Sequence, residues 1–203
     1  MKLFLLGSTG KAGRAILREA LERGHFVTAY VRTPSKIAQP HPHLTLIQGD
    51  AIDTDRLAKY MAGQDAVLSS LDAQTLKRSS LQRQLAESVR GAMESSRVSR
   101  LLILSVAFLY DNAGVATFVL GRTIFRHVRQ GSSEMEEVIQ QSRFDWTIVR
   151  LPRLLDSVTP KSYRTVVGHA PPAVTISSGA LASFLLDEID EAKFIRTIVG
   201  VSG

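Results

Sequence analysis

Three glycines recur at three-residue intervals in the segment Gly7-Ser8-Thr9-Gly10-Lys11-Ala12-Gly13. Glycine at position 7 can adopt the backbone angles of a tight turn, and Gly10 lets the main chain approach a pyrophosphate closely. Gly13 lets a following helix pack against a preceding strand. Because the N–H groups and the positive dipole end of such a helix attract anions, the segment predicts a phosphate-binding turn. The contributing residues are expected to be Gly7, Thr9, Gly10, Lys11, Ala12 and Gly13.

The segments around this turn are those that a dinucleotide site needs. An apolar run, Lys2–Leu6, precedes the turn, and a helix-like segment with Ala12, Ile16 and Ala20 on one face follows it. A second apolar run at Phe26–Val31 completes a strand–helix–strand unit. Glycine turns also join strands to helices where no ligand binds, so a purely structural turn is the alternative. The context favours a dinucleotide site.

Two basic residues follow the second apolar run. Arg32 comes directly after it, and Lys36 lies four residues further on. Folds that bind NAD usually carry an acidic residue here, which binds the ribose 2′-hydroxyl. A guanidinium instead suits a 2′-phosphate, because it makes bidentate charge-assisted hydrogen bonds to phosphate oxygens. We therefore predict NADPH as the cofactor rather than NADH, with a solvated strand end as the alternative for Arg32.

Asp50 and Ala51 follow a third expected strand, Leu44–Ile47. At a strand end beside the expected adenine pocket, Asp50 can accept a hydrogen bond from the base. It can equally form a turn around Gly49, since aspartate side chains often bond to nearby backbone. Both interpretations are open at this stage. The next helix is expected to begin at Asp53 or Thr54.

The remaining pattern predicts a doubly wound α/β fold with a mostly parallel sheet. The expected strand Arg100–Ser105 is continuously apolar between its ends, which implies that helices cover both of its faces. Further strands are expected at Ala66–Leu71 and Phe144–Arg150, the latter ended by Pro152. The other expected elements are helices at Ser80–Ser95, Glu134–Ser142 and Gly179–Ile189, and strands at Arg164–Val167, Ala173–Ile176 and Phe194–Val199. On the first of these helices, every fourth residue is apolar, and this stripe is interpreted as core: Leu81, Leu85, Val89 and Met93.

Length and composition suggest one domain over residues 1–203, with residues 151–203 forming a small substrate-side subregion. Residues 111–133 are expected to be mostly loop. The chain has no cysteine, which excludes disulfides and agrees with a cytoplasmic protein. The net charge of +6 comes from basic residues scattered over most of the chain, but Arg122, Arg126, His127 and Arg129 gather in one place. Such a local cluster suits a small anionic ligand better than a nucleic-acid duplex, so nucleic acid is not expected as a partner. No membrane partner and no metal site are expected.

Candidate site residues lie where the strands end, because ligands in such sheets bind at the carboxyl ends of the strands. Ser70 and Leu71 are expected along the cofactor. Ser105 and Tyr110 are the candidate catalytic residues. Ser105 could hydrogen-bond the acceptor or a nicotinamide amide, and its alternative role is to end the strand. Tyr110 could stack on a flat acceptor or donate its hydroxyl, and packing beside Phe108 is its alternative.

A basic cluster could bind an anionic group of the substrate, with a solvated surface role as the alternative. It contains Arg122, Arg126 and His127. Three nearby acidic residues, Glu134, Glu136 and Glu137, are interpreted as one solvated helix face. Trp146 and Arg150 alternate on an expected strand and are assigned to packing and structural pairing.

In these motifs, the sequence resembles the atypical short-chain dehydrogenase/reductases that have an NAD(P)H-binding, NmrA-like Rossmann domain. Within them it is similar to the biliverdin reductase B / flavin reductase type. The resemblance extends over nearly the whole chain: GSTGKAG at Gly7, GHFVTAYVR ending at Arg32, GDAID at Asp50, SVAFLYD from Ser105, SRFDWTIVRLPRLLD from Ser142 and TISSGALASFLL from Thr175. The resemblance implies NADPH selection by Arg32, a nicotinamide near Ser105, and main-chain contacts from Leu151 and Pro152.

The acceptors that the resemblance implies are flavins (FMN or FAD as substrate), biliverdin-like tetrapyrroles and quinones. No tyrosine has a lysine four residues on, so the Tyr-x-x-x-Lys pair of ordinary short-chain dehydrogenases is missing. That argues against alcohol–ketone chemistry, which needs a strong proton donor. The alternatives are an NmrA-like redox sensor without turnover and, less favoured, a sugar-nucleotide epimerase or dehydratase. A monomer or a homodimer is expected.

Overall fold

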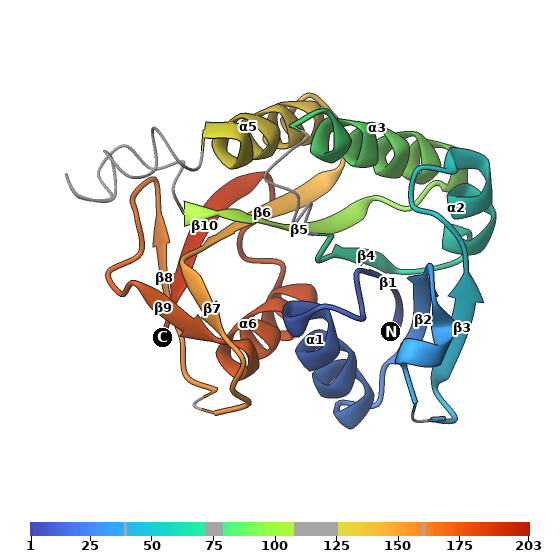
Figure 1. The fold of residues 1–203 in the computed structure, drawn as a ribbon, viewed down its shortest axis with the longest axis horizontal. Coiled ribbons are helices and arrows are strands. Elements are labelled where there is room, and N and C mark those ends of the chain that lie inside the picture. Colours follow the sequence, from blue (N-terminus) through green and yellow to red (C-terminus); the bar gives the residue numbers. More distant parts are fainter. Residues whose placement is uncertain (39, 72–78, 108–125, 160) are drawn as a thin grey trace.

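The computed structural model describes residues 1–38, 40–71, 79–107, 126–159 and 161–203, and side chains of residues 79–80 and 126–128 lie outside the description. The apolar runs form a sheet of eight described strands, in the order β3-β2-β1-β4-β5-β6-β10-β8 (Figure 1). These are β1 (Lys2–Leu6), β2 (Phe26–Val31), β3 (Leu44–Gln48), β4 (Ala66–Ser69), β5 (Arg100–Val106), β6 (Asp145–Leu151), β8 (Arg164–Val167) and β10 (Thr197–Ser202).

All neighbouring strands of this sheet are parallel except β8, which runs antiparallel to β10. The strand order reverses at β1, which pairs with β2 on one side and β4 on the other. The predicted doubly wound α/β fold is therefore confirmed. The C-terminal ends of β1 to β6 lie along one edge of the sheet, which we call the carboxyl edge. The opposite edge is the amino edge.

Helices cover both faces of the sheet, as the continuously apolar strands require (Figure 1). One face is covered by α1 (Lys11–Glu22) and α6 (Ser178–Glu191). The other is covered by α2 (Thr54–Met61), α3 (Ser79–Ser96) and α5 (Arg126–Gln140). None of the helices in the described parts combines the length and apolar composition that a membrane crossing needs.

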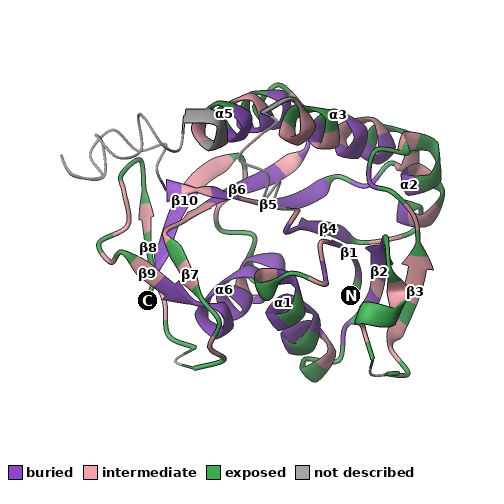
Figure 2. Ribbon diagram, in the orientation of Figure 1, coloured by how far each residue is buried: buried purple, intermediate pink, exposed green. Residues whose placement is uncertain are grey.

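Successive side chains of β5 point alternately toward the helices on the two faces of the sheet. Leu102 and Leu104 pack with the α1 and α6 side, whereas Leu101 and Ile103 belong to the core beneath α2, α3 and α5. Figure 2 shows the central strands buried and the outward helix faces exposed. The same alternation decides which polar residues near the strand ends face which helices.

Several expected boundaries differ from the structure. The last strand begins at Thr197, not at Phe194. Helix α5 begins at Arg126, eight residues before the expected start, because the small residues Gly131 and Ser132 are buried within the helix and do not interrupt it. Residues 111–125 of the expected loop lie outside the described residues.

A second, two-stranded sheet was not predicted. It pairs β7 (Arg153–Leu155) in parallel with β9 (Thr175–Ser177). Pro152 does separate β6 from the next segment, but the chain resumes an extended course one residue later and finds a partner about twenty residues away. The candidate strand at Ala173–Ile176 corresponds to β9.

Candidate functional site

The turn after β1 is built around Gly7. Its φ of +80° lies in the left-handed region that favours glycine. A Cβ atom at Gly7 would lie 2.6 Å from the backbone oxygen of Ser70, and one at Gly13 would collide with the backbone oxygen of Gly7. The close packing of α1 against the ends of β1 and β4 thus depends on two of the three glycines.

The third glycine, Gly10, is the N-cap of α1 and has a different environment. A Cβ atom there would meet only the oxygen of Gly7, at an ordinary contact distance of 3.5 Å. The helix has no side-chain cap and no acidic residue in its first turn, whereas Asp53 caps α2 and Ser177 caps α6. The N–H groups of α1 are therefore open to an anion, and this cradle fits the pyrophosphate of a dinucleotide.

A cavity of about 320 Å³ lies at the carboxyl edge, between the start of α1 and the ends of β4, β5 and β6. It is therefore next to the point where the strand order reverses, which is where ligands bind in open α/β sheets. Eight of the predicted site residues line it: Gly10, Lys11, Ala12, Ser70, Leu71, Ser105, Leu151 and Pro152.

Four further predicted cofactor residues lie along the same edge but do not line the cavity. Arg32 follows β2 and Lys36 ends a short 3₁₀ turn (Pro34–Lys36), and both are exposed. Asp50 is also exposed, and its carboxylate accepts a hydrogen bond from the backbone N–H of Ile52 at 3.3 Å. This contact is the turn chemistry that was one of its two interpretations. Ala51, beside it, is buried.

The structure leaves the expected substrate-side residues mostly undescribed. Tyr110 and Arg122 lie outside the described residues. Arg126 and His127 form the first turn of α5, but their side chains also lie outside the description. Their assignment to the substrate remains a prediction.

One expectation about the site was wrong. Glu136 is not part of a solvated face: it is 2% exposed and points toward the strands, whereas Glu137 is exposed. Its carboxylate accepts a hydrogen bond from Ser105 Oγ at 2.5 Å. Arg150 donates to both of its oxygens, from Nε at 2.9 Å and from Nη2 at 2.6 Å. The pairing assigned to Arg150 is thus present, with a partner that was not predicted.

The helical period contains the signal for this inward position. Ser132, Met135, Glu136 and Ile139 are all buried and recur at intervals of three and four residues. This stripe was not recognised because Glu134 and Glu137, which lie close to Glu136 in the sequence, suggested a solvated face. Arg150 is a charged residue on the mostly buried strand β6. Such a residue also implies a buried partner of opposite charge.

Other cavity residues were not predicted as site residues. They include Gln82 and Leu85 on α3 and Ser132 and Met135 on α5. Leu85 was interpreted as part of a core stripe. It lines the cavity together with Ala86 and Val89 of the same helix. Gln82 lies three residues before Leu85, so it shares this face. No cluster of metal-ligating side chains is present in the described part of the chain.

Comparison with known proteins identifies the family. A family model described as NAD(P)H-binding matches residues 7–192, which begin at the first glycine of the turn. The chain belongs to this NAD(P)H-binding family. The uncharacterised protein YwnB of Bacillus subtilis is similar to this chain, with 25% identity over 95% of this chain and 94% of its own length.

Solved structures share the fold of this NAD(P)H-binding protein. A short-chain dehydrogenase/reductase (wide type) from Veillonella parvula, solved in complex with NADP, has a TM-score of 0.80 at 20% identity and covers 100% of this chain and 94% of its own. SP1627 from Streptococcus pneumoniae, a candidate NADH-flavin reductase, has a TM-score of 0.83 at 20% identity and covers 100% of this chain and 99% of its own.

Proposed function

We propose that this NAD(P)H-binding protein is an NADPH-dependent reductase that transfers a hydride to a flat conjugated acceptor such as a flavin, a biliverdin-like tetrapyrrole or a quinone. The observation that carries the proposal is the cavity itself. It runs from the open N-terminus of α1, beside Gly10, to Ser105 at the end of β5. One continuous space therefore joins an anion-binding helix end to a polar group suited to a nicotinamide or an acceptor.

In this proposal the chain binds NADPH along the carboxyl edge. The backbone N–H groups at the start of α1 hold the pyrophosphate, and Arg32 with Lys36 binds the 2′-phosphate. Asp50 and Ala51 lie on the adenine side. Leu151 and Pro152 border the nicotinamide end of the cavity, opposite α3 and α5. When bound, the dinucleotide supplies the hydride, and the protein supplies position and excludes water.

The walls of the cavity suit a flat conjugated acceptor. Apolar side chains of Leu71, Leu85, Ile103 and Met135 face the same space as Ser105. Such walls can stack against an extended ring system. A conjugated acceptor also needs little acid catalysis, which fits a chain without the Tyr-x-x-x-Lys pair. Tyr110 and the cluster of Arg122, Arg126 and His127 are proposed to contact the acceptor.

The test is NADPH oxidation by the purified protein with FMN, biliverdin and a simple quinone in turn, together with calorimetric titration of NADPH and NADP⁺. Turnover with one of these acceptors is the expected result, and the relative rates rank the substrates. Tight dinucleotide binding with turnover of none of the three acceptors would overturn the reductase assignment. It would point to a redox sensor instead.

A further inference from the structure

Ser105 and Arg150 are neighbours in the sheet. They are Cα partners in the register of β5 and β6, so both project from the same face of the sheet. That face carries α5, and Glu136 on this helix meets both side chains. Ser105 is 5% exposed and still lines the cavity, whereas Glu136 and Arg150 do not, so Ser105 is the member of this buried group that borders the cavity.

The contacts fix which way the Ser105 hydroxyl proton points. Glu136 Oε1 accepts from both Ser105 Oγ and Arg150 Nε, and its Oε2 accepts from Arg150 Nη2. A guanidinium can only donate hydrogen bonds, so both oxygens of Glu136 act as acceptors toward Arg150. The serine must then supply the proton of the 2.5 Å contact. Having one proton, it can offer the cavity only the lone pairs of its oxygen.

A second polar side chain that lines the cavity also has a hydrogen-bond acceptor available for a ligand. Gln82 lines the cavity from α3, and its Oε1 atom is buried and has no hydrogen-bond partner among the described residues. A buried amide oxygen without a partner is unfavourable, and a ligand donor would satisfy it. Two polar groups that line the cavity, Ser105 on β5 and Gln82 on α3, can therefore each accept a hydrogen bond from a ligand.

We propose that Glu136 is a positioning residue that turns Ser105 into a hydrogen-bond acceptor, and that Ser105 and Gln82 together select ligand groups that carry N–H donors. This inference rests on the proposed function, because it concerns the same cavity. The N–H group could belong to the nicotinamide carboxamide or to the ring of the hydride acceptor. Ser105 in this arrangement binds and orients the ligand, and it does not protonate the reduced product.

The test compares ligands that differ only in the donor. In the cofactor arm, calorimetry measures the affinity of NADP⁺ and of its 3-acetylpyridine analogue, in which a methyl ketone replaces the carboxamide. In the acceptor arm, it measures lumiflavin and 3-methyllumiflavin, whose ring N–H is blocked, each with NADP⁺ present. The proteins are wild type, Ser105→Ala, Gln82→Met and Glu136→Gln, with Glu137→Gln as the matched control on the exposed side of α5.

The wild-type protein is expected to prefer the N–H ligand about tenfold in at least one arm. In that arm Ser105→Ala and Glu136→Gln should reduce the preference to about twofold or less, and Gln82→Met should reduce it in one of the two arms. Glu137→Gln should retain it. A preference ratio is unaffected by general damage to the fold, which weakens both ligands equally. If Glu136→Gln does not fold, Ser105→Ala and Gln82→Met still test the selection of N–H donors.

Two results would overturn the proposal: equal wild-type affinity for both ligands in both arms, or a preference that persists in Ser105→Ala and Gln82→Met. Either result leaves the proposed function intact if NADP⁺ still binds and NADPH is still oxidised. Failure of the wild-type protein to bind NADP⁺ at all would instead overturn the proposed function, and the inference with it. The arm that shows the preference identifies whether the donor belongs to cofactor or acceptor.

Discussion

Two buried arginine–glutamate pairs join helices to the neighbouring strands β5 and β6, one at each edge of the sheet. At the amino edge, Arg100 Nη2 meets Glu188 Oε1 at 2.7 Å, and at the carboxyl edge Arg150 Nη2 meets Glu136 Oε2 at 2.6 Å. Both glutamate side chains are almost completely buried, at 2% and 3% exposure. The two pairs are alike in chemistry and differ in what else they contact.

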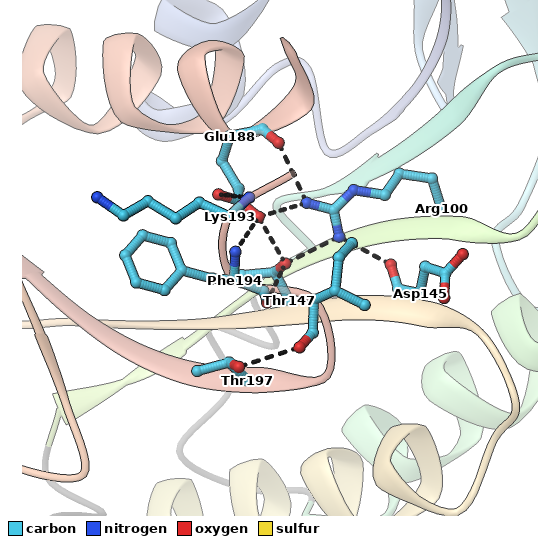
Figure 3. A network of polar contacts seen from close by, with 8 residues as sticks. Arg100, Asp145, Thr147, Glu188, Lys193, Phe194 and Thr197 are labelled. Carbon is cyan, nitrogen blue, oxygen red and sulfur yellow. Dashed lines mark hydrogen bonds and ion pairs between the residues drawn. The ribbon is translucent and has the colours of Figure 1, made fainter. Parts of the chain in front are cut away.

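The amino-edge pair makes further hydrogen bonds to neighbouring residues of the protein (Figure 3). Glu188 accepts hydrogen bonds from the backbone N–H groups of Lys193 and Phe194, at 3.1 and 2.9 Å. The Thr147 hydroxyl joins the pair to the carbonyl of Phe194. Burial lowers the pKa of Arg100, although Glu188 acts in the opposite direction. The group therefore anchors the segment between α6 and β10 to the base of the sheet.

The carboxyl-edge pair instead includes Ser105, which lines the cavity. An arginine–glutamate pair thus anchors the chain at the amino edge, and we propose that the second such pair orients a hydroxyl that lines the cavity at the carboxyl edge. We therefore expect substitutions at the amino edge to change the free energy of unfolding, and substitutions at the carboxyl edge to change ligand affinity.

The largest effect is expected for Glu188→Ala. Removing one member of a buried pair leaves Arg100 charged and unpartnered, which should lower the free energy of unfolding by about 3–5 kcal/mol. Urea titration measures the change, with the exposed Glu191→Ala as control. At temperatures where Glu188→Ala is folded, its NADP⁺ affinity should equal that of wild type. A loss below about 1 kcal/mol would contradict the anchoring role.

The next effect concerns Arg32→Ala at the carboxyl edge. Losing a charge-assisted contact to the 2′-phosphate should weaken NADPH by roughly 30- to 100-fold, equivalent to about 2–3 kcal/mol, with little change for NADH. Arg18→Ala, which removes one exposed positive charge from α1, is the control. Calorimetry with both cofactors provides the measurement. Equal weakening of NADPH and NADH would place the 2′-phosphate elsewhere.

The smallest effect is a pH dependence at the amino edge. Burial lowers the pKa of His25, and the nearby positive N-terminus lowers it further. The folded protein thus binds fewer protons than the unfolded chain, and stability present above pH ~6.5 falls as the pH drops toward the folded-state pKa. We expect a loss of about 1 kcal/mol or less between pH 7 and 5, and a flatter profile in His25→Gln. Urea titrations across this range that coincide for both proteins would contradict the assignment.

The sequence was sufficient to predict the elements whose signal is local. The strands β1, β2 and β5 follow from apolar runs, the turn at Gly7 from its glycines, and the α2 cap from Asp53. The inward position of Glu136 was missed because its neighbours Glu134 and Glu137 suggested a solvated face. Its partners on β5 and β6 are 31 and 14 residues away.

The second sheet was missed for a related reason. The pairing of β7 with β9 depends on how the chain returns after Pro152, and the three-residue strand β7 has no distinctive pattern of its own. At the site, apolar residues of the α3 stripe, such as Leu85, looked like core residues because a cavity wall and a core contact have the same composition. Spatial arrangement alone distinguishes them.

The central claim is that the open start of α1 binds a dinucleotide, and Gly10→Ala tests it most directly. A Cβ atom fits there without collision, so the free energy of unfolding should stay within about 1 kcal/mol of wild type. The added methyl would face the pyrophosphate, so calorimetric NADPH affinity should fall at least about tenfold. Unchanged NADPH affinity in Gly10→Ala, or no binding by the wild-type protein, would contradict the account.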